Sequence, residues 1–130
     1  MKMNFFALLL MSFLVFSCQG QTASKEYLLK AADFENQWKT EKGLMLDVRT
    51  AAEFKEGHIE GAKNIDFLQD DFEANTAQLD KNQPIYVYCK SGGRSAKAIE
   101  KLRKQGFTNL YELEGGYGAW KANTVTQNKK

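Results

Sequence analysis

One short segment of the chain gathers the residue types that nucleophilic sulfur chemistry requires. Two glycines let the backbone turn tightly, so that several N–H groups can point at one atom. Two basic side chains and the positive end of a following helix favour an anion at the same place. A cysteine held there is expected to ionise readily and to act as a nucleophile. The segment reads Cys89, Lys90, Ser91, Gly92, Gly93, Arg94 and Ser95.

The same loop is suited to hold an anion beside Cys89, such as a thiosulfate, a phosphate or a sulfur atom bound to the cysteine. An inert cysteine buried at the end of a strand is the ordinary interpretation of an isolated cysteine. Here the glycines, both cations and a helix start coincide within seven residues. We therefore predict an anion-binding loop with Cys89 as its nucleophile.

Composition and charge leave few other kinds of chemistry. The chain has 130 residues, of which 43% are hydrophobic and 26% charged, and this is typical of one folded domain. Its formal net charge of +2 gives no electrostatic reason for a nucleic acid partner. One histidine and two widely separated cysteines offer no metal-ligand spacing, and no motif indicates an organic cofactor or an oligomer. We expect a monomer without metal, cofactor or nucleic acid.

Strands and helices alternate along the chain and position the cysteine loop. Apolar runs predict strands at 27–29, 44–48, 85–88 and 109–113. Periodic runs predict helices at 33–40, 51–56, 95–105 and 117–122, and a partly irregular stretch at 67–79. The polar residues 123–130 are expected to form a frayed tail. Such alternation predicts an α/β domain with a mostly parallel sheet, helices on both faces, and its site at the carboxyl ends of the strands.

The start of the chain has the features of an export signal. Lys2 precedes an apolar run from Phe5 to Phe16, which is too short to cross a bilayer as a helix. Ser17 then precedes Cys18. A small residue directly before a cysteine resembles the lipobox of bacterial lipoproteins, in which the cysteine is lipidated and the signal is cut just before it.

This resemblance implies a signal peptide at 1–17, lipid on Cys18 and a tether at 18–26. The domain would then be exported and anchored by lipid to a membrane of the periplasm or cell envelope. The alternative is an ordinary secretory signal in which Cys18 is incidental. With Cys18 lipidated, Cys89 would be the only free thiol of the mature chain.

Four motifs in order resemble a single-domain rhodanese over residues 27–122. They are the run from Asp47-Val48-Arg49-Thr50 to Glu53-Phe54, the run Gly57-His58-Ile59-Glu60-Gly61-Ala62-Lys63-Asn64-Ile65, the cysteine loop, and Leu113-Glu114-Gly115-Gly116-Tyr117-Gly118-Ala119-Trp120. The resemblance implies a three-layer rhodanese-like fold and a sulfurtransferase that carries sulfur as a persulfide on Cys89. It also implies that Lys90 and Arg94 bind the charge of the donor. The loop N–H groups would stabilise the outer sulfur, and they belong to Lys90, Ser91, Gly92, Gly93, Arg94 and Ser95.

The resemblance further implies the reaction and its partners. A small anionic donor such as thiosulfate would load the cysteine, and cyanide or a thiol, including one on a thioredoxin-like protein, would take the sulfur. A carrier that a partner loads is an alternative. A phosphatase or arsenate reductase is another, but those similar domains have five residues between cysteine and arginine. This chain has four between Cys89 and Arg94, which suits a single sulfur atom.

Three further motif residues are candidates for supporting roles. By the resemblance, Asp47 helps to hold the loops together, and Arg49 either does the same or contacts the substrate. His58 is the only histidine, and in this motif it stabilises a turn. A general base is not required, because an attacking thiolate has no proton to lose.

Overall fold

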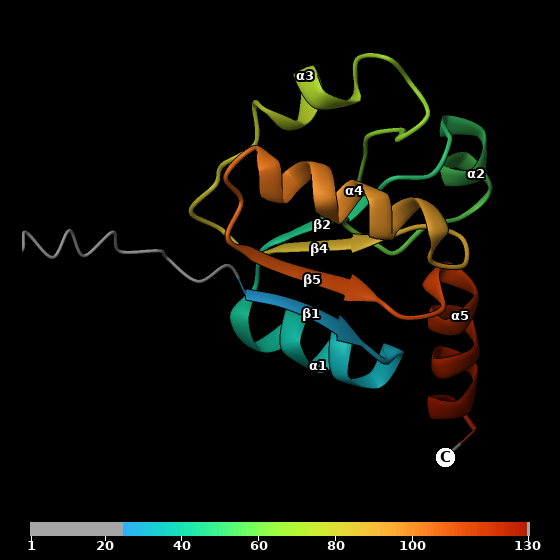
Figure 1. Ribbon diagram of the computed structural model, residues 1–130. Coiled ribbons are helices and arrows are strands. Elements are labelled where there is room, and N and C mark those ends of the chain that lie inside the picture. The colour runs from blue at the N-terminus through green and yellow to red at the C-terminus, as the bar shows by residue number, and fades with distance from the viewer. Residues whose placement is uncertain (1–24, 130) are drawn as a thin grey trace, which may run out of the picture.

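The part of the chain that the structure describes runs from Lys25 to Lys129 (Figure 1), and the structure is a computed structural model. The expected signal peptide, Cys18 and most of the expected tether lie outside the described residues. Across 25–129, no helix has the length and hydrophobicity needed to traverse a membrane.

A five-stranded sheet forms the centre of the fold (Figure 1). Its strands are β1 (Lys25–Leu29), β2 (Leu44–Asp47), β3 (Lys63–Asn64), β4 (Ile85–Tyr88) and β5 (Asn109–Leu113). They lie in the order β1-β5-β4-β2-β3, and every pair of neighbours is parallel. The predicted parallel sheet is confirmed, and the central strand β4 is the one that leads into the cysteine loop.

Helices cover both faces of this sheet. They are α1 (Ala31–Glu41), α2 (Ala51–Glu56), α3 (Phe72–Thr76), α4 (Gly93–Lys104) and α5 (Gly116–Gln127). Figure 1 shows α1 and α4 on opposite sides of the strands, with α3 beyond α4 and α5 beside the carboxyl ends of β4 and β5. This arrangement confirms the predicted α/β domain, with a parallel sheet and helices on both of its faces.

Strand β4 shows why the sheet needs cover on both faces. Ile85 and Val87 pack into the hydrophobic cluster on the α4 side, whereas Tyr86 and Tyr88 pack into the cluster on the α1 side. All four side chains are fully buried. Alternate side chains point to opposite faces of a strand, so a strand that is apolar throughout lies between two helical layers.

Several boundaries differ from the sequence prediction, most of them by one or two residues. Helix α4 begins at Gly93 rather than Ser95, because Gly92 ends the loop with a positive φ of 124°. Helix α5 continues to Gln127, so the predicted frayed tail is wrong for residues 123–127. The side chains of Asn123 and Gln127 donate to Glu35 Oε2 at 3.3 and 3.1 Å. These contacts with α1 stabilise the last turns, and a local pattern does not reveal them.

The short strand β3 was not predicted from the sequence. It contains two residues, and it pairs with the carboxyl end of β2. The Asn64 side chain donates to the backbone carbonyls of Asp47 and Arg49 at 3.0 and 2.8 Å. Strand β3 thus supports the segment that carries two of the candidate site residues.

Candidate active site

Cys89 lies directly after β4, at the carboxyl edge of the sheet, and helix α4 begins four residues later. Its side chain is buried, with 1% of the residue exposed. The neighbouring strand β2 ends at Asp47, which pairs with Tyr88 in the sheet register. The fold therefore brings the cysteine loop and the segment from Asp47 to Arg49 to the same edge, as predicted.

The Cys89 sulfur lies within a set of hydrogen-bond donors. The Gly92 N–H donates to Sγ at 3.0 Å, and the Ser95 hydroxyl oxygen lies 3.4 Å from Sγ. Burial opposes ionisation, but hydrogen bonds from the Ser95 hydroxyl and from the N–H groups of Ser95, Gly92 and Ser91 outweigh it. They lower the pKa of the Cys89 thiol below its ordinary value. These hydrogen bonds are the largest of the effects that lower the Cys89 pKa. The sequence prediction had also attributed the lowering to the cations Lys90 and Arg94.

The backbone of the loop depends on glycine at one position in particular. Gly92 has a φ of 124°, a conformation that L side chains rarely adopt. This conformation turns its N–H toward the sulfur. Gly93 is the first residue of α4 and has no such φ, so only the first of the two predicted glycines is required by backbone conformation.

The hydroxyl of Ser95 has three hydrogen-bond partners, and the Cys89 thiol is the one that donates to it. Besides the sulfur, it lies 3.1 Å from the Gly92 carbonyl oxygen and 3.0 Å from Glu112 Oε1. Ser95 itself is fully buried. Sequence reasoning did not single out Glu112, although a carboxylate inside the apolar run of β5 is an unusual residue that could have drawn attention.

Replacing Ser95 with alanine should move the reactivity of Cys89 to higher pH. The variant loses the hydroxyl that bonds to the thiolate, while the Gly92 N–H bond remains. A hydrogen bond to a charged group contributes about 1.5–3 kcal/mol, so alkylation by iodoacetamide at neutral pH should slow by about tenfold or more. The rate is measured from pH 5 to pH 10. Ser91→Ala serves as the control because it keeps the backbone N–H, and an equal loss in both variants would refute the role of the hydroxyl.

Arg94 is paired with a carboxylate that the sequence analysis did not identify. Its Nη1 and Nη2 lie 2.7 and 2.9 Å from the two carboxylate oxygens of Glu53 on α2. Glu53 also accepts from the Thr50 N–H and hydroxyl, in a capping box that begins α2. The pattern Thr50-x-x-Glu53 is visible in the sequence as a helix start, but it does not reveal that the carboxylate reaches across to Arg94.

Asp47 and Arg49 form a second ion pair, inside the protein. Arg49 Nε lies 3.0 and 3.1 Å from the two Asp47 carboxylate oxygens, and its Nη2 lies 2.6 Å from Oδ2. The same Nη2 donates to the Gly57 carbonyl oxygen at 2.7 Å. Asp47 is fully buried and Arg49 is 4% exposed. These contacts hold the segments after β2 and α2 together.

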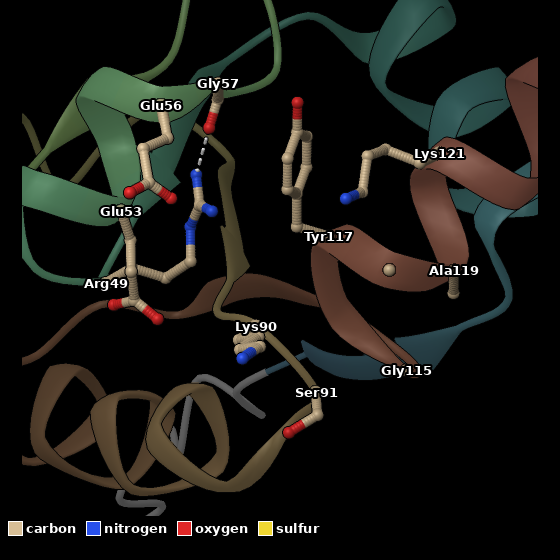
Figure 2. Close-up of a pocket in the computed structure, with 11 residues that line it drawn as sticks. Arg49, Glu53, Glu56, Gly57, Lys90, Ser91, Gly115, Tyr117, Ala119 and Lys121 are labelled. Atoms are coloured by element: carbon tan, nitrogen blue, oxygen red, sulfur yellow. Dashed lines mark hydrogen bonds between the residues drawn. The ribbon is translucent and has the colours of Figure 1, made fainter.

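A cavity of about 580 Å³ lies beside the cysteine loop (Figure 2). In Figure 2 the ring of Tyr117 stands between Arg49 and Lys121, whose charged groups lie 4.5 and 5.0 Å from the ring centre. Lys90 and Ser91 of the loop also contribute to the wall. The predicted site residues Arg49, Lys90 and Ser91 thus meet at one cavity, and Tyr117 and Lys121 are additions from α5.

The start of α5 is hydrogen-bonded to the backbone of the cysteine loop. The Tyr117 N–H donates to the Cys89 carbonyl oxygen at 2.8 Å, and the Gly118 N–H reaches the Lys90 carbonyl oxygen at 3.4 Å. Gly116 has a φ of 62°, and a Cβ there would lie 2.6 Å from the Cys89 carbonyl oxygen. The close approach of two backbones explains why this motif contains glycine.

His58 lies outside this constellation. Its Nδ1 is 2.8 Å from the Phe54 carbonyl oxygen, and its ring stacks on the Phe54 ring with centroids 3.7 Å apart. It is exposed, and it does not line the cavity. These contacts are those of a residue that stabilises the turn after α2.

Together these features define a class of protein, namely a parallel α/β domain with a buried, hydrogen-bonded cysteine at the carboxyl end of its central strand. The family model of the rhodanese-like domain matches residues 24–123. The chain therefore belongs to the rhodanese-like domain family.

Several curated proteins are similar to this chain. It is 43% identical over 79 residues to the uncharacterized protein YqhL of Bacillus subtilis, with 61% of each chain covered. It is 39% identical over 88 residues to thiosulfate sulfurtransferase 16, chloroplastic, of Arabidopsis thaliana, covering 60% of this chain and 73% of the relative. The thiosulfate sulfurtransferase GlpE of Shewanella oneidensis is 36% identical over 76 residues, with 58% and 73% covered. The chain thus spans about three fifths of the Bacillus protein and about three quarters of the other two.

Solved structures share the fold. A rhodanese-related protein from Thermoplasma volcanium superposes with a TM-score of 0.66 at 29% identity, covering 75% of this chain and 92% of its own. The rhodanese-like domain of the Anabaena protein Alr3790 gives a TM-score of 0.66 at 30% identity, with 76% of each chain covered. Two of the curated relatives above are named as thiosulfate sulfurtransferases.

Proposed function

We propose that this chain is an exported sulfurtransferase that moves a sulfane sulfur from a donor to an acceptor through a persulfide on Cys89. The observation that carries the proposal is the pair of hydrogen bonds at the sulfur, one from the Gly92 N–H and one with the Ser95 hydroxyl. They favour the thiolate, which is the form that attacks sulfur. The same N–H groups can then stabilise the charge of an outer sulfur atom.

The reaction proceeds in two displacements. The Cys89 thiolate attacks the outer sulfur of thiosulfate, a bond forms between Sγ and that sulfur, and sulfite leaves with the electron pair of the broken S–S bond. An acceptor such as cyanide then attacks the outer sulfur, which leaves as thiocyanate and restores the thiolate. No proton needs to move in either step, so no general base is required.

Steady-state kinetics with thiosulfate and cyanide test this function. Because the sulfur resides on the protein between the steps, double-reciprocal plots at several cyanide concentrations should be parallel, and thiocyanate should accumulate over many turnovers. Intersecting lines, or no thiocyanate above the protein-free rate, would contradict the proposal. Hydrolysis of an aryl phosphate, lost in Cys89→Ser, would instead support the phosphatase alternative.

A persulfide carrier loaded by a protein partner is a second candidate, and one observation favours it. Arg94, which was expected to bind the donor's charge, already pairs with Glu53 through both terminal nitrogens. A loop with less free positive charge captures a small anion less well. After loading, the carrier would pass its sulfur to a thiol acceptor, for which we propose a thioredoxin-like protein. Stoichiometric loading from a protein persulfide without turnover on thiosulfate would identify this function.

The proposed localisation depends on Cys18 and is tested separately. We expect the chain, expressed in a bacterium, to be found in the membrane fraction and to gain the mass of a lipid group. Cys18→Ala should release it into the soluble fraction. The same distribution for both variants would contradict the lipid anchor. Cys89→Ala, which changes the other cysteine, is the control and should remain in the membrane fraction.

A further inference from the structure

We propose that Glu53 sets the donor selectivity of the cysteine loop. By pairing with Arg94 it cancels the positive charge that a small dianionic donor would use, so the loop favours donors with a single negative charge. This inference rests on the proposed function, because it concerns the donor of the same reaction. The role of Glu53 is to set the charge and position of Arg94, and it needs no direct contact with the donor.

Arg94 uses both of its terminal nitrogens to bind Glu53. Both terminal nitrogens face the carboxylate, at 2.7 and 2.9 Å, in the bidentate arrangement that is the strongest for arginine and a carboxylate. The two side chains are 23% and 28% exposed, so solvent screens the pair only in part. Asp66 adds a further negative potential at Arg94.

Glu53 remains ionised over the whole working range of pH. The hydrogen bond from the Arg94 guanidinium is the largest cause, and hydrogen bonds from Thr50 add to it, while partial burial opposes them. They hold the pKa of Glu53 at about 2. The pair with Arg94 is therefore present whenever the Cys89 thiolate is present, and its effect on donors does not depend on pH near neutrality.

The other charges around the cavity do not replace that of Arg94. Arg49 is matched by the buried Asp47, in the ion pair described above. Lys90 is exposed on the loop, and Lys121 lies over the outer side of the Tyr117 ring. Glu56 lines the same cavity and adds a negative charge. A dianion at the loop would thus meet mainly solvated lysines, which attract it weakly.

The discriminating experiment compares two alkylating reagents that differ in charge. Iodoacetate is an anion and iodoacetamide is neutral, and both alkylate the Cys89 thiolate, so their rate ratio reports the potential that an anion meets at the sulfur. In Glu53→Gln the Arg94 charge is no longer matched, and the iodoacetate-to-iodoacetamide ratio should rise roughly tenfold. Glutamine also suits this position of a capping box, so α2 should keep its start.

Two further variants make the result specific. Glu100→Gln removes the same charge from the exposed face of α4 and should leave the ratio within about twofold of the wild type. The double variant Glu53→Gln with Arg94→Gln replaces the ion pair with two neutral side chains. It should return the ratio to near the wild-type value, even if its overall rate differs. An unchanged ratio in Glu53→Gln, with the fold retained by circular dichroism, would overturn the proposal.

The same variants are then compared as enzymes. Thiosulfate carries two negative charges and methanethiosulfonate carries one. After the outer sulfur is transferred to Cys89, thiosulfate leaves as sulfite and methanethiosulfonate leaves as methanesulfinate. In Glu53→Gln the KM for thiosulfate should fall roughly tenfold relative to the KM for methanethiosulfonate, with little change in kcat. Equal changes for both donors would overturn the proposal. If the wild type transfers sulfur from neither donor, the proposed function fails, while the alkylation ratio still decides the role of Glu53.

Discussion

Replacing Cys89 with serine is expected to abolish sulfur transfer. A serine hydroxyl cannot form a persulfide, so the first displacement has no product, and kcat with thiosulfate and cyanide should fall by at least about a thousandfold. The fold should be retained, because serine fits the space of cysteine and its hydroxyl oxygen can accept the hydrogen bond that the Gly92 N–H makes to the sulfur. The measurement is thiocyanate formation, together with circular dichroism of the variant.

The other cysteine provides the matched control. Cys18→Ala removes a thiol far from the loop in the sequence and should leave turnover unchanged. Full activity in Cys89→Ser, or an equal loss in Cys18→Ala, would show that the activity does not depend on a Cys89 persulfide. Either result would reject the assignment of the nucleophile.

Replacing Asp47 with alanine should cause the largest loss of stability of any change near the site. The Asp47 carboxylate accepts from the Arg49 backbone N–H at 2.9 Å as well as from its guanidinium, and both residues are buried. Its removal leaves a buried cation without its partner, which costs about 3–5 kcal/mol. Domains of this size have a free energy of unfolding of about 5–15 kcal/mol, so the substitution removes a large fraction of it.

Chemical denaturation measures this loss as a fall in the free energy of unfolding. An exposed ion pair supplies the control: Lys101 Nζ lies 2.7 Å from Glu73 Oε1, and the Glu73 side chain is 60% exposed. Glu73→Ala should therefore unfold at nearly the wild-type denaturant concentration. If Asp47→Ala is too unstable to purify, Asp47→Asn, which keeps the shape but not the charge, is measured in its place. Equal midpoints for the buried and exposed variants would contradict the structural role of Asp47.

The sheet was predictable because its signals are local. Ile85–Tyr88 is apolar at every position, and only a strand covered on both faces accommodates such a run. The ends of α2 were also predictable, since Thr50 with Glu53 starts a helix and Gly57 follows its last residue. Helix α5 was predicted too short, because its last turns depend on contacts with Glu35, far away in the sequence.

The position of the cysteine loop could likewise be predicted from the sequence, whereas the charge pairing around it could not. The loop from Cys89 to Ser95 predicted a sulfur surrounded by N–H groups, and the structure places the Gly92 N–H at the sulfur. The sequence also suggested Arg94 as a free cation, because its partner Glu53 is distant in the chain and lies on another helix. Charge pairing across elements is a property of the tertiary fold, and local patterns do not contain it.

The mass of the intact protein after incubation with thiosulfate tests the central claim most directly. The full chain with Cys18→Ala is used, so that Cys89 is the only cysteine. We expect a gain of one sulfur atom, located on the peptide that contains Cys89, and its loss on addition of cyanide with release of one thiocyanate. An unchanged mass after incubation with both thiosulfate and methanethiosulfonate, in a protein whose Cys89 still reacts with iodoacetamide, would contradict the account.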